Sequence, residues 1–187
     1  SVLVDEAHNL VDRARGMYSV QLEQQRLLKL KKTAPKPVKA ALERTARAWQ
    51  ALIRDHGEQA PPVFLTILPS QLLGALQAMV SVITDYLADN PPDLALQEVM
   101  FESVAFMKLA DSFGDHSLCE FQRSGRGRAR LTIQNLVPAD FLTERFRAAH
   151  SVLLFSATLS PGVYYRDLLG LPEDARFTSL PSPFSAE

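Results

Sequence analysis

The chain has 187 residues, of which 47% are hydrophobic and 22% are charged, and this composition is that of a globular protein of about one domain. No apolar run approaches the roughly 20 residues of a membrane span, which argues against a membrane protein. The single Cys119 excludes an internal disulfide, and the sequence shows no secretory leader. We therefore expect a cytoplasmic protein.

The formal net charge is −1, but the charges are segregated along the chain. Residues 26–54 hold nine Lys and Arg against one acidic residue, and residues 55–120 hold ten acidic residues against one Lys. Residues 121–150 are basic again, with six Arg against two acidic residues. Such segregation can give a nearly neutral protein a basic face.

The first predicted elements are a strand and a helix, an order typical of an α/β edge. Val2–Val4 predicts a short, fully buried strand, and Asp5 stands where its side chain could cap a helix over residues 6–15. Residues 20–32 are compatible with a second helix, which Pro35 must end.

The middle of the chain predicts a helical bundle. Apolar residues recur in steps of three and four from Val38 to Leu52 and again from Leu72 to Leu87, and prolines follow both stretches. Ser70 can cap the second of these helices. Residues 94–113 carry apolar side chains on two sides and predict a well-buried helix.

Short apolar runs replace the helical pattern after Gly114. They predict a β-hairpin over about 117–134, with glycines and arginines at its turn. A short helix over about 139–149 then leads into a buried strand at 151–155. The predicted fold is mainly α, with a hairpin and one short strand towards each end of the chain.

The strongest local signal is the pair of carboxylates, Asp5 and Glu6, directly after the first predicted strand. Ligands of α/β folds bind at the C-terminal ends of strands. Phosphoryl-transfer enzymes need one acid there to hold a Mg²⁺ that bridges the phosphates, and a second acid to position and deprotonate the attacking water. The competing interpretation is structural, with Asp5 as a helix cap and Glu6 as a favourable acid in the first turn.

The second signal is Ser156-Ala157-Thr158-Leu159-Ser160-Pro161, which also follows an apolar strand. Hydroxyl groups at a strand end can hydrogen-bond an acidic site and pass its state to whatever packs beyond it. If residues 2–4 and 151–155 pair in parallel, both motifs emerge at one sheet edge. Taken alone, the segment also fits an ordinary turn or helix cap.

Together the two segments resemble motifs II and III of superfamily 2 helicases, specifically the XPD/DinG branch. The similarity lies in Asp5-Glu6-Ala7-His8-Asn9-Leu10 and in residues 156–161, and residues 180–185 resemble the segment that enters the second motor domain. In that branch a helical arch domain separates motifs II and III. The opening strand without an initiator Met also predicts an internal piece of a longer protein.

The resemblance implies a small parallel β remnant of a RecA-like α/β motor domain, to which a mainly helical arch with a β-hairpin is attached. Residues 1–9 would be the motif II strand, 10–149 the arch, 150–178 the motif III strand and its following helix, and 179–187 a connector to the second motor domain.

The resemblance also implies a role for each motif residue. Asp5 would coordinate Mg²⁺ through water, Glu6 would activate the hydrolytic water, and His8 would link the nucleotide site to the coupling motif of Ser156, Ala157 and Thr158. The parent protein, a DinG-like helicase, would use ATP to translocate on single-stranded DNA and to unwind forked DNA, in repair or replication.

Two parts of such an enzyme are not found in this sequence. None of its eight glycines begins a G-x-x-x-x-G-K-[ST] phosphate loop, so we expect the isolated chain to be inactive as an ATPase. One cysteine cannot hold an iron–sulfur cluster, which in this branch lies upstream of motif II. We expect a monomer without membrane contacts.

Basic residues outside the motifs are candidates for contacts with DNA phosphates. They are Lys31, Lys32, Lys36, Arg123, Arg126, Arg128 and Arg130. A solvated helix face and an ordinary charged hairpin tip are the competing interpretations. The competing function is a non-enzymatic helical module that binds protein partners through its charged faces and ignores nucleic acid.

Overall fold

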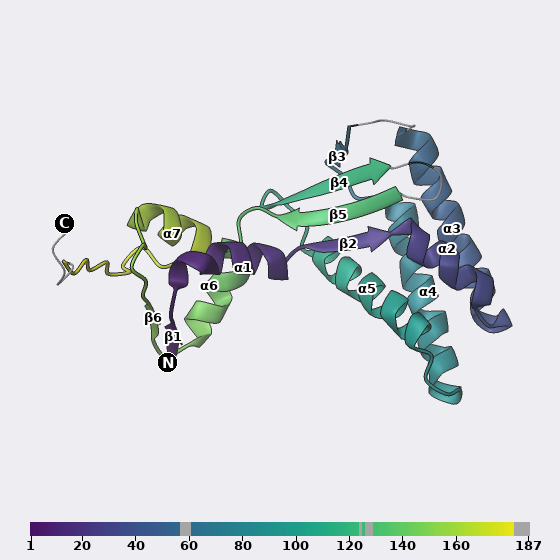
Figure 1. The fold of residues 1–187 in the computed structure, drawn as a ribbon, viewed down its shortest axis with the longest axis horizontal. Helices are drawn as coiled ribbons and strands as arrows, with labels where there is room; N and C mark the ends of the chain where they lie inside the picture. Colours follow the sequence, from purple (N-terminus) through teal and green to yellow (C-terminus); the bar gives the residue numbers. More distant parts are fainter. Residues whose placement is uncertain (57–60, 124, 126–128, 182–187) are drawn as a thin grey trace, which may run out of the picture. The chain divides into compact units, whose positions relative to one another are not determined.

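The computed structural model describes residues 1–56, 61–123, 125 and 129–181, and the chain forms two compact units (Figure 1). One unit combines Ser1–Arg15 with Val137–Glu187, and the other is Gly16–Leu136. Helices make up most of the regular structure, which confirms the mainly α prediction. The second unit lies within the residues 10–149 that were expected to form an insertion.

The first unit contains a two-stranded parallel sheet. Its strands are β1, Val2–Val4, and β6, Val152–Leu154, and Leu3 pairs with Leu153 at their centre. This pairing confirms the parallel arrangement predicted from the two strand-end motifs. The unit's other elements are a 3₁₀ turn η1 (Ala7–Asn9), α1 (Leu10–Met17, which runs into the next unit), α6 (Ala139–Ala148) and α7 (Gly162–Leu169).

The first strand was predicted to be fully buried and the second to be buried, and both predictions are wrong for the described chain. Leu3 is 71% exposed and Leu153 is 57% exposed, and Phe155 just beyond β6 is also exposed. Parallel sheets are normally covered on both faces, and a sheet of two strands cannot cover its own faces. The sheet therefore leaves apolar surface open to solvent.

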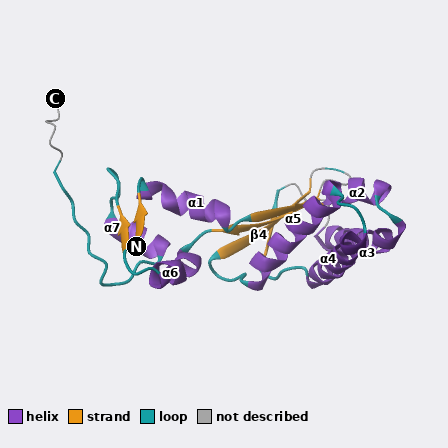
Figure 2. Ribbon diagram, turned by 90° about the horizontal axis from the view of Figure 1, so that it is seen from below, coloured by secondary structure: helices purple, strands orange, loops and turns teal. Residues whose placement is uncertain are grey.

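The second unit packs helices on one face of an antiparallel sheet (Figures 1 and 2). The strand order is β2-β5-β4-β3, and all neighbouring pairs are antiparallel. The strands are β2 (Val20–Glu23), β3 (Val63–Leu65), β4 (Ser117–Arg123) and β5 (Ala129–Asn135). The helices are α2 (Gln24–Thr33), α3 (Lys36–His56), α4 (Ser70–Asp89) and α5 (Leu94–Asp111).

Alternation along the strands explains why only one face is covered. Cys119 and Phe121 on β4 stand opposite Ile133 and Leu131 on β5, and all four side chains are buried. Apart from Leu118, their chain neighbours on the other face, such as Glu120, are polar and partly exposed. A one-sided antiparallel sheet needs this two-residue period. The predicted hairpin is thus confirmed, as the centre of a larger sheet.

The residues from 20 to 23 were predicted to be helical and are instead strand β2. Val20 and Leu22 pair with Ile133 and Leu131 of β5, so their apolar side chains face the helices. The helix begins only at Gln24, in α2. Tertiary pairing therefore overrides the helical pattern in these four residues.

The long helices divide into confirmed and corrected predictions. Helix α3 buries Val38, Leu42, Thr45, Trp49 and Leu52 as its spacing predicted. Ser70 was expected to cap α4, but it is the helix's first residue and Pro69 stands at the cap without a side-chain hydrogen bond. Helix α5 is not well buried, because Phe101 is 62% exposed and only Leu96, Ser103 and Phe106 are buried.

Helix α4 is long and apolar enough to cross a membrane by length and composition, and no other described helix is. Core helices share both properties. Leu72, Leu76, Met79 and Ile83 of α4 are buried against the rest of the unit, and the hydroxyl of Thr45 on α3 donates to the carbonyl oxygen of Ala75 over 3.2 Å. The helix thus serves as part of the core of this unit.

Candidate functional site

The two motif segments leave the parallel sheet at the same edge, because β1 and β6 run in the same direction. Backbone hydrogen bonds continue the pairing past both strands. The amide of Phe155 donates to the carbonyl oxygen of Val4 over 3.0 Å. The amide of Ala7 in turn donates to the carbonyl oxygen of Phe155 over 3.1 Å. Ala7 is fully buried. Backbone hydrogen bonds therefore fix the turn after β1 against the C-terminal end of β6.

The turn itself has an unusual backbone at Glu6. Its φ of 50° and ψ of 43° lie in the left-handed region. Among the described non-glycine residues of the chain, Glu6 alone has a positive φ. Such conformations cost free energy and cluster at functional sites and tight turns. A carboxylate oxygen of Asp5 accepts the Glu6 amide over 2.7 Å and supports the turn. Both carboxylates remain exposed to solvent.

This geometry corrects the helix-cap interpretation of Asp5. A capping side chain accepts an amide two or three residues further along the chain, whereas Asp5 accepts that of its immediate neighbour. The helical conformation begins at Ala7 as a 3₁₀ turn, and α1 begins at Leu10. Asp5 and Glu6 are therefore turn residues before the helix.

His8 joins the two motifs. Its Nδ1 lies 2.7 Å from Oγ of Ser156 and 3.1 Å from a carboxylate oxygen of Glu6. A ring protonated on Nδ1 fits both contacts, because that N–H then points towards two acceptors, whereas a bare Nδ1 would face the carboxylate with a lone pair. The His8 side chain is about one-third exposed, at 32%.

Ser156 extends the link into its own segment. Its hydroxyl oxygen also accepts the amide of Thr158 over 3.3 Å, which forms a local turn. Glu6, His8, Ser156 and the backbone of Thr158 are thus connected in one series. Ala157 and Thr158 are both exposed to solvent. Asp5 joins the series only through the Glu6 amide.

The donor set fits a hydrated Mg²⁺ better than a metal held by protein alone. Within the described residues no three His, Cys, Asp or Glu side chains gather around one point. Mg²⁺ keeps several waters and is commonly held by one or two carboxylates together with phosphates. The exposed carboxylates of Asp5 and Glu6 at a strand end offer that arrangement. Cys119, buried and single, offers no ligand set for an iron–sulfur cluster.

The basic candidates lie in the second unit and on separate elements. Lys31 and Lys32 are in the last turn of α2, Lys36 begins α3, Arg123 ends β4, and Arg130 in β5 donates to Gln122. Arg126 and Arg128 lie outside the described residues. The described candidates are therefore distributed over four elements of this unit.

Another set of basic residues was not singled out from the sequence. Arg44, Arg47 and Arg54 line a groove of about 380 Å³ between α3 and the start of α4. Their spacing of three and seven residues places them on one helix face, and this was the signal that could have identified them.

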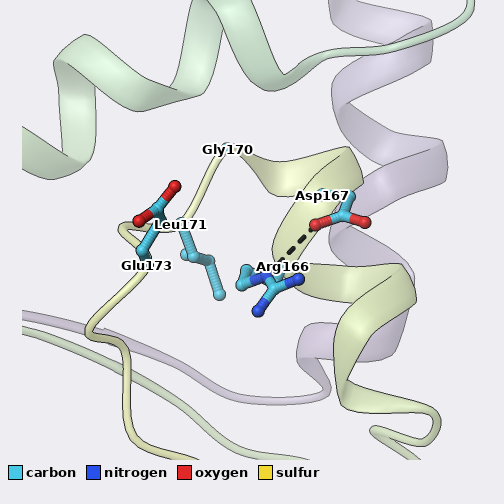
Figure 3. A pocket seen from close by; sticks show the side chains of 5 residues that line it. All are labelled: Arg166, Asp167, Gly170, Leu171 and Glu173. Carbon is cyan, nitrogen blue, oxygen red and sulfur yellow. Dashed lines mark hydrogen bonds and ion pairs between the residues drawn. The ribbon is translucent and has the colours of Figure 1, made fainter.

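A larger hollow, of about 520 Å³, lies at the C-terminal end of α7 (Figure 3). Arg166, Asp167, Gly170, Leu171 and Glu173 line it. Arg166 is paired with Asp167 over 3.1 Å, so its charge is already neutralised there. None of the motif residues lines this hollow. We therefore place the candidate site at the acidic turn rather than at this hollow.

Comparison of the sequence with models of protein families and with curated proteins found no match to this chain.

Proposed function

We propose that this chain is part of an ATP-dependent DNA helicase of the DinG-like branch. One observation carries the proposal: His8 contacts Ser156 and Glu6 at the same time, so the acidic motif and the hydroxyl motif form one connected group. A motor needs such a physical link between its hydrolysis site and the element that reports the nucleotide state. The resemblance to motifs II and III assigns those two functions to these segments.

The proposed chemistry divides between the two carboxylates. Asp5 is exposed beside the strand end and would hold the water shell of a Mg²⁺, which would supply positive charge for the phosphates of ATP. Glu6 accepts a proton from the attacking water. Its carboxylate is also close enough to His8 to change that ring's hydrogen bonding when its own charge or position changes.

His8 and Ser156 transmit the change. When Glu6 engages water and nucleotide, the shared Nδ1–H of His8 turns towards Ser156, and when Glu6 is free the same N–H is divided between both acceptors. Ser156 also holds the Thr158 amide, so a change at His8 reaches the chain that follows β6. The coupling role of Ser156, Ala157 and Thr158 belongs to this proposal.

The exposed apolar surface of the parallel sheet supports the proposal that this sheet is part of a larger motor domain. Leu3 and Leu153 stand next to each other on the two paired strands and are mostly exposed. In a RecA-like domain, further parallel strands and helices would cover them. We propose that the second unit, Gly16–Leu136, is the arch-like insertion of this domain.

The test is the Glu6→Gln variant of the longer protein that contains this chain, measured by DNA-stimulated ATP hydrolysis. Loss of a general base lowers turnover by roughly 10²- to 10⁴-fold. The matched control is Glu173→Gln, which also removes one exposed carboxylate from the same unit. Equal turnover in both variants would remove Glu6 from the mechanism and leave the helicase proposal without its catalytic residue.

A non-enzymatic interaction module remains the second candidate, because α5 carries exposed apolar side chains at Leu94, Phe101 and Val104. An exposed apolar surface of this kind can bind a protein partner. This candidate predicts no ATPase activity in the longer protein, with or without DNA. Measurable DNA-stimulated hydrolysis that depends on Glu6 would exclude it as the main function.

A further inference from the structure

The groove between α3 and α4 is basic along one side. Arg44, Arg47 and Arg54 project from α3, and all three are exposed. With a rise of about 1.5 Å per residue, the ten residues from Arg44 to Arg54 span about 15 Å of helix. Within the described residues none of the three has an acidic side chain at ion-pair distance. Their charges are therefore available to a ligand.

Small residues form the floor of the same groove. Ala48 and Ala51 of α3 and Gly74 and Ala75 of α4 line it, and none of them has a side chain larger than a methyl group. A Cβ built on Gly74 meets no atom within 4 Å, which shows that the space above this residue is open. An extended chain can therefore approach the helix backbones between the arginines and α4.

The charged side chains that line the groove are all basic. Gln71 borders it at the start of α4, and the first turn of α4 contains no acidic residue. The partial positive charge of that helix end adds to the arginines. On α3 the acidic residues are Glu43 and Asp55, and neither lines the groove.

We propose that this groove binds the phosphate backbone of a single-stranded nucleic acid. Arg guanidinium groups match phosphate geometry and can donate two hydrogen bonds to one phosphate. A row of about 15 Å suits several successive phosphates better than one isolated phosphate. The choice of a nucleic-acid strand rests on the proposed helicase function, whereas the choice of a polyanion rests on the groove alone.

The residues that line the groove indicate how a nucleic-acid strand would be bound. Trp49, the single tryptophan, is buried in the core of this unit, and no aromatic side chain lines the groove, so the bases have no stacking surface there. Binding is then carried by phosphates, independent of base sequence and strongly dependent on salt. Three neutralised phosphates give a slope of about −2 in a plot of log affinity against log salt for a single strand.

Gly74 permits a test that does not depend on removing the arginines. Gly74→Glu places a negative charge in open space over the floor, and replacing a helical Gly favours the helix by up to about 1 kcal/mol. Gly74→Ala is the matched control without charge, and Gly74→Lys is the control for bulk with the opposite charge. All three variants are expected to fold.

The experiment is a titration of the 187-residue chain against a fluorescent single-stranded oligodeoxynucleotide, at several salt concentrations and without ATP. We expect Gly74→Glu to weaken binding at least tenfold, and Gly74→Ala and Gly74→Lys to bind at least as well as the parent chain. The triple variant R44Q/R47Q/R54Q is expected to weaken binding and to reduce the salt slope by about 2.

A second triple variant, K108Q/R145Q/R147Q, removes the same formal charge from exposed positions elsewhere. Equal weakening by both triple variants, no effect of Gly74→Glu, or no binding by the parent chain at low salt would each overturn the proposal. Competition by poly-glutamate as strong as that by unlabelled DNA would assign the groove to acidic proteins instead. Because this titration needs no hydrolysis, its failure is distinct from a failure of the Glu6→Gln test.

Discussion

The hydroxyl oxygen of Ser156 lies 2.7 Å from Nδ1 of His8, although 148 positions of the chain separate the two residues. The parallel pairing of β1 with β6 produces this approach, because it places the ends of both strands at one sheet edge. Both residues belong to the first unit, so the contact is a property of that unit alone.

The contact predicts energetic coupling between His8 and Ser156. We expect a double-mutant cycle with His8→Ala and Ser156→Ala to give a coupling free energy of about 0.5–1.5 kcal/mol in urea unfolding, the net value of one partly exposed hydrogen bond. Thr158→Ala is the control, because Ser156 binds the backbone of Thr158 and not its side chain. Additive effects of His8→Ala and Ser156→Ala would show that the two residues do not interact.

Gly170 is predicted to resist substitution. It ends α7 with a φ of 63°, and an added Cβ would meet the carbonyl oxygen of Ala139 on α6 at 2.8 Å. We expect Gly170→Ala to lower the free energy of unfolding by about 1–3 kcal/mol or more, from backbone strain and the clash together.

The control for Gly170 is Gly16→Ala in α1, where an added Cβ meets nothing within 4 Å. That variant should be neutral or slightly stabilising, since Ala favours the helix over Gly. Chemical denaturation of both variants checks the prediction. A Gly170→Ala protein as stable as the parent would contradict the left-handed cap and its close approach to α6.

Helix α5 supplies a pair of phenylalanines with opposite environments. Phe106 is fully buried, whereas Phe101 is 62% exposed. We expect Phe106→Ala to cost about 3–5 kcal/mol of stability, as large-to-small changes do in a packed core. Phe101→Ala should change stability by no more than about 0.5 kcal/mol. Similar losses for both would mean that α5 is covered on both sides, as its sequence had predicted.

The parts of the fold that the sequence predicts are those in which one local pattern is sufficient. The stripe from Val38 to Leu52 has helical spacing over four turns, and all the residues named for it are buried in α3. The hairpin around Cys119 follows from two alternating runs with a turn between them. The parallel pairing of β1 with β6 followed from the position of the two motifs, since neither three-residue strand specifies a partner by itself.

The parts that the sequence did not predict depend on neighbours distant in the chain. Val20 to Glu23 is a strand because β5 offers it a partner, and β3 is a strand because β4 does. The exposure of Phe101 depends on which elements cover α5, which apolar spacing does not state. The left-handed Glu6 and the groove along Arg44 likewise require three-dimensional packing, so neither could be derived from spacing alone.

Burial raises the pKa of the Cys119 thiol from its ordinary value of 9.0 to about 12. The folded chain therefore keeps this proton at pH values where the unfolded chain releases it. The neutral thiol's contribution to the free energy of unfolding is fully present below pH 9. It is lost as the pH rises towards 12, by up to about 1.4 kcal/mol per pH unit. Other groups titrate in the same range, so the comparison must be with a variant that lacks only the thiol.

Cys119→Ala is that variant, because it keeps an apolar side chain on the buried face of β4. We expect the parent chain to be the more stable of the two at pH 8, and its advantage to shrink steadily as the pH rises from 9 to 10.5, with reductant present to prevent oxidation. Urea unfolding at each pH measures the difference. A constant advantage across this range would mean that the thiol ionises equally in the folded and unfolded chains, which is incompatible with a Cys119 enclosed between the sheet and the helices.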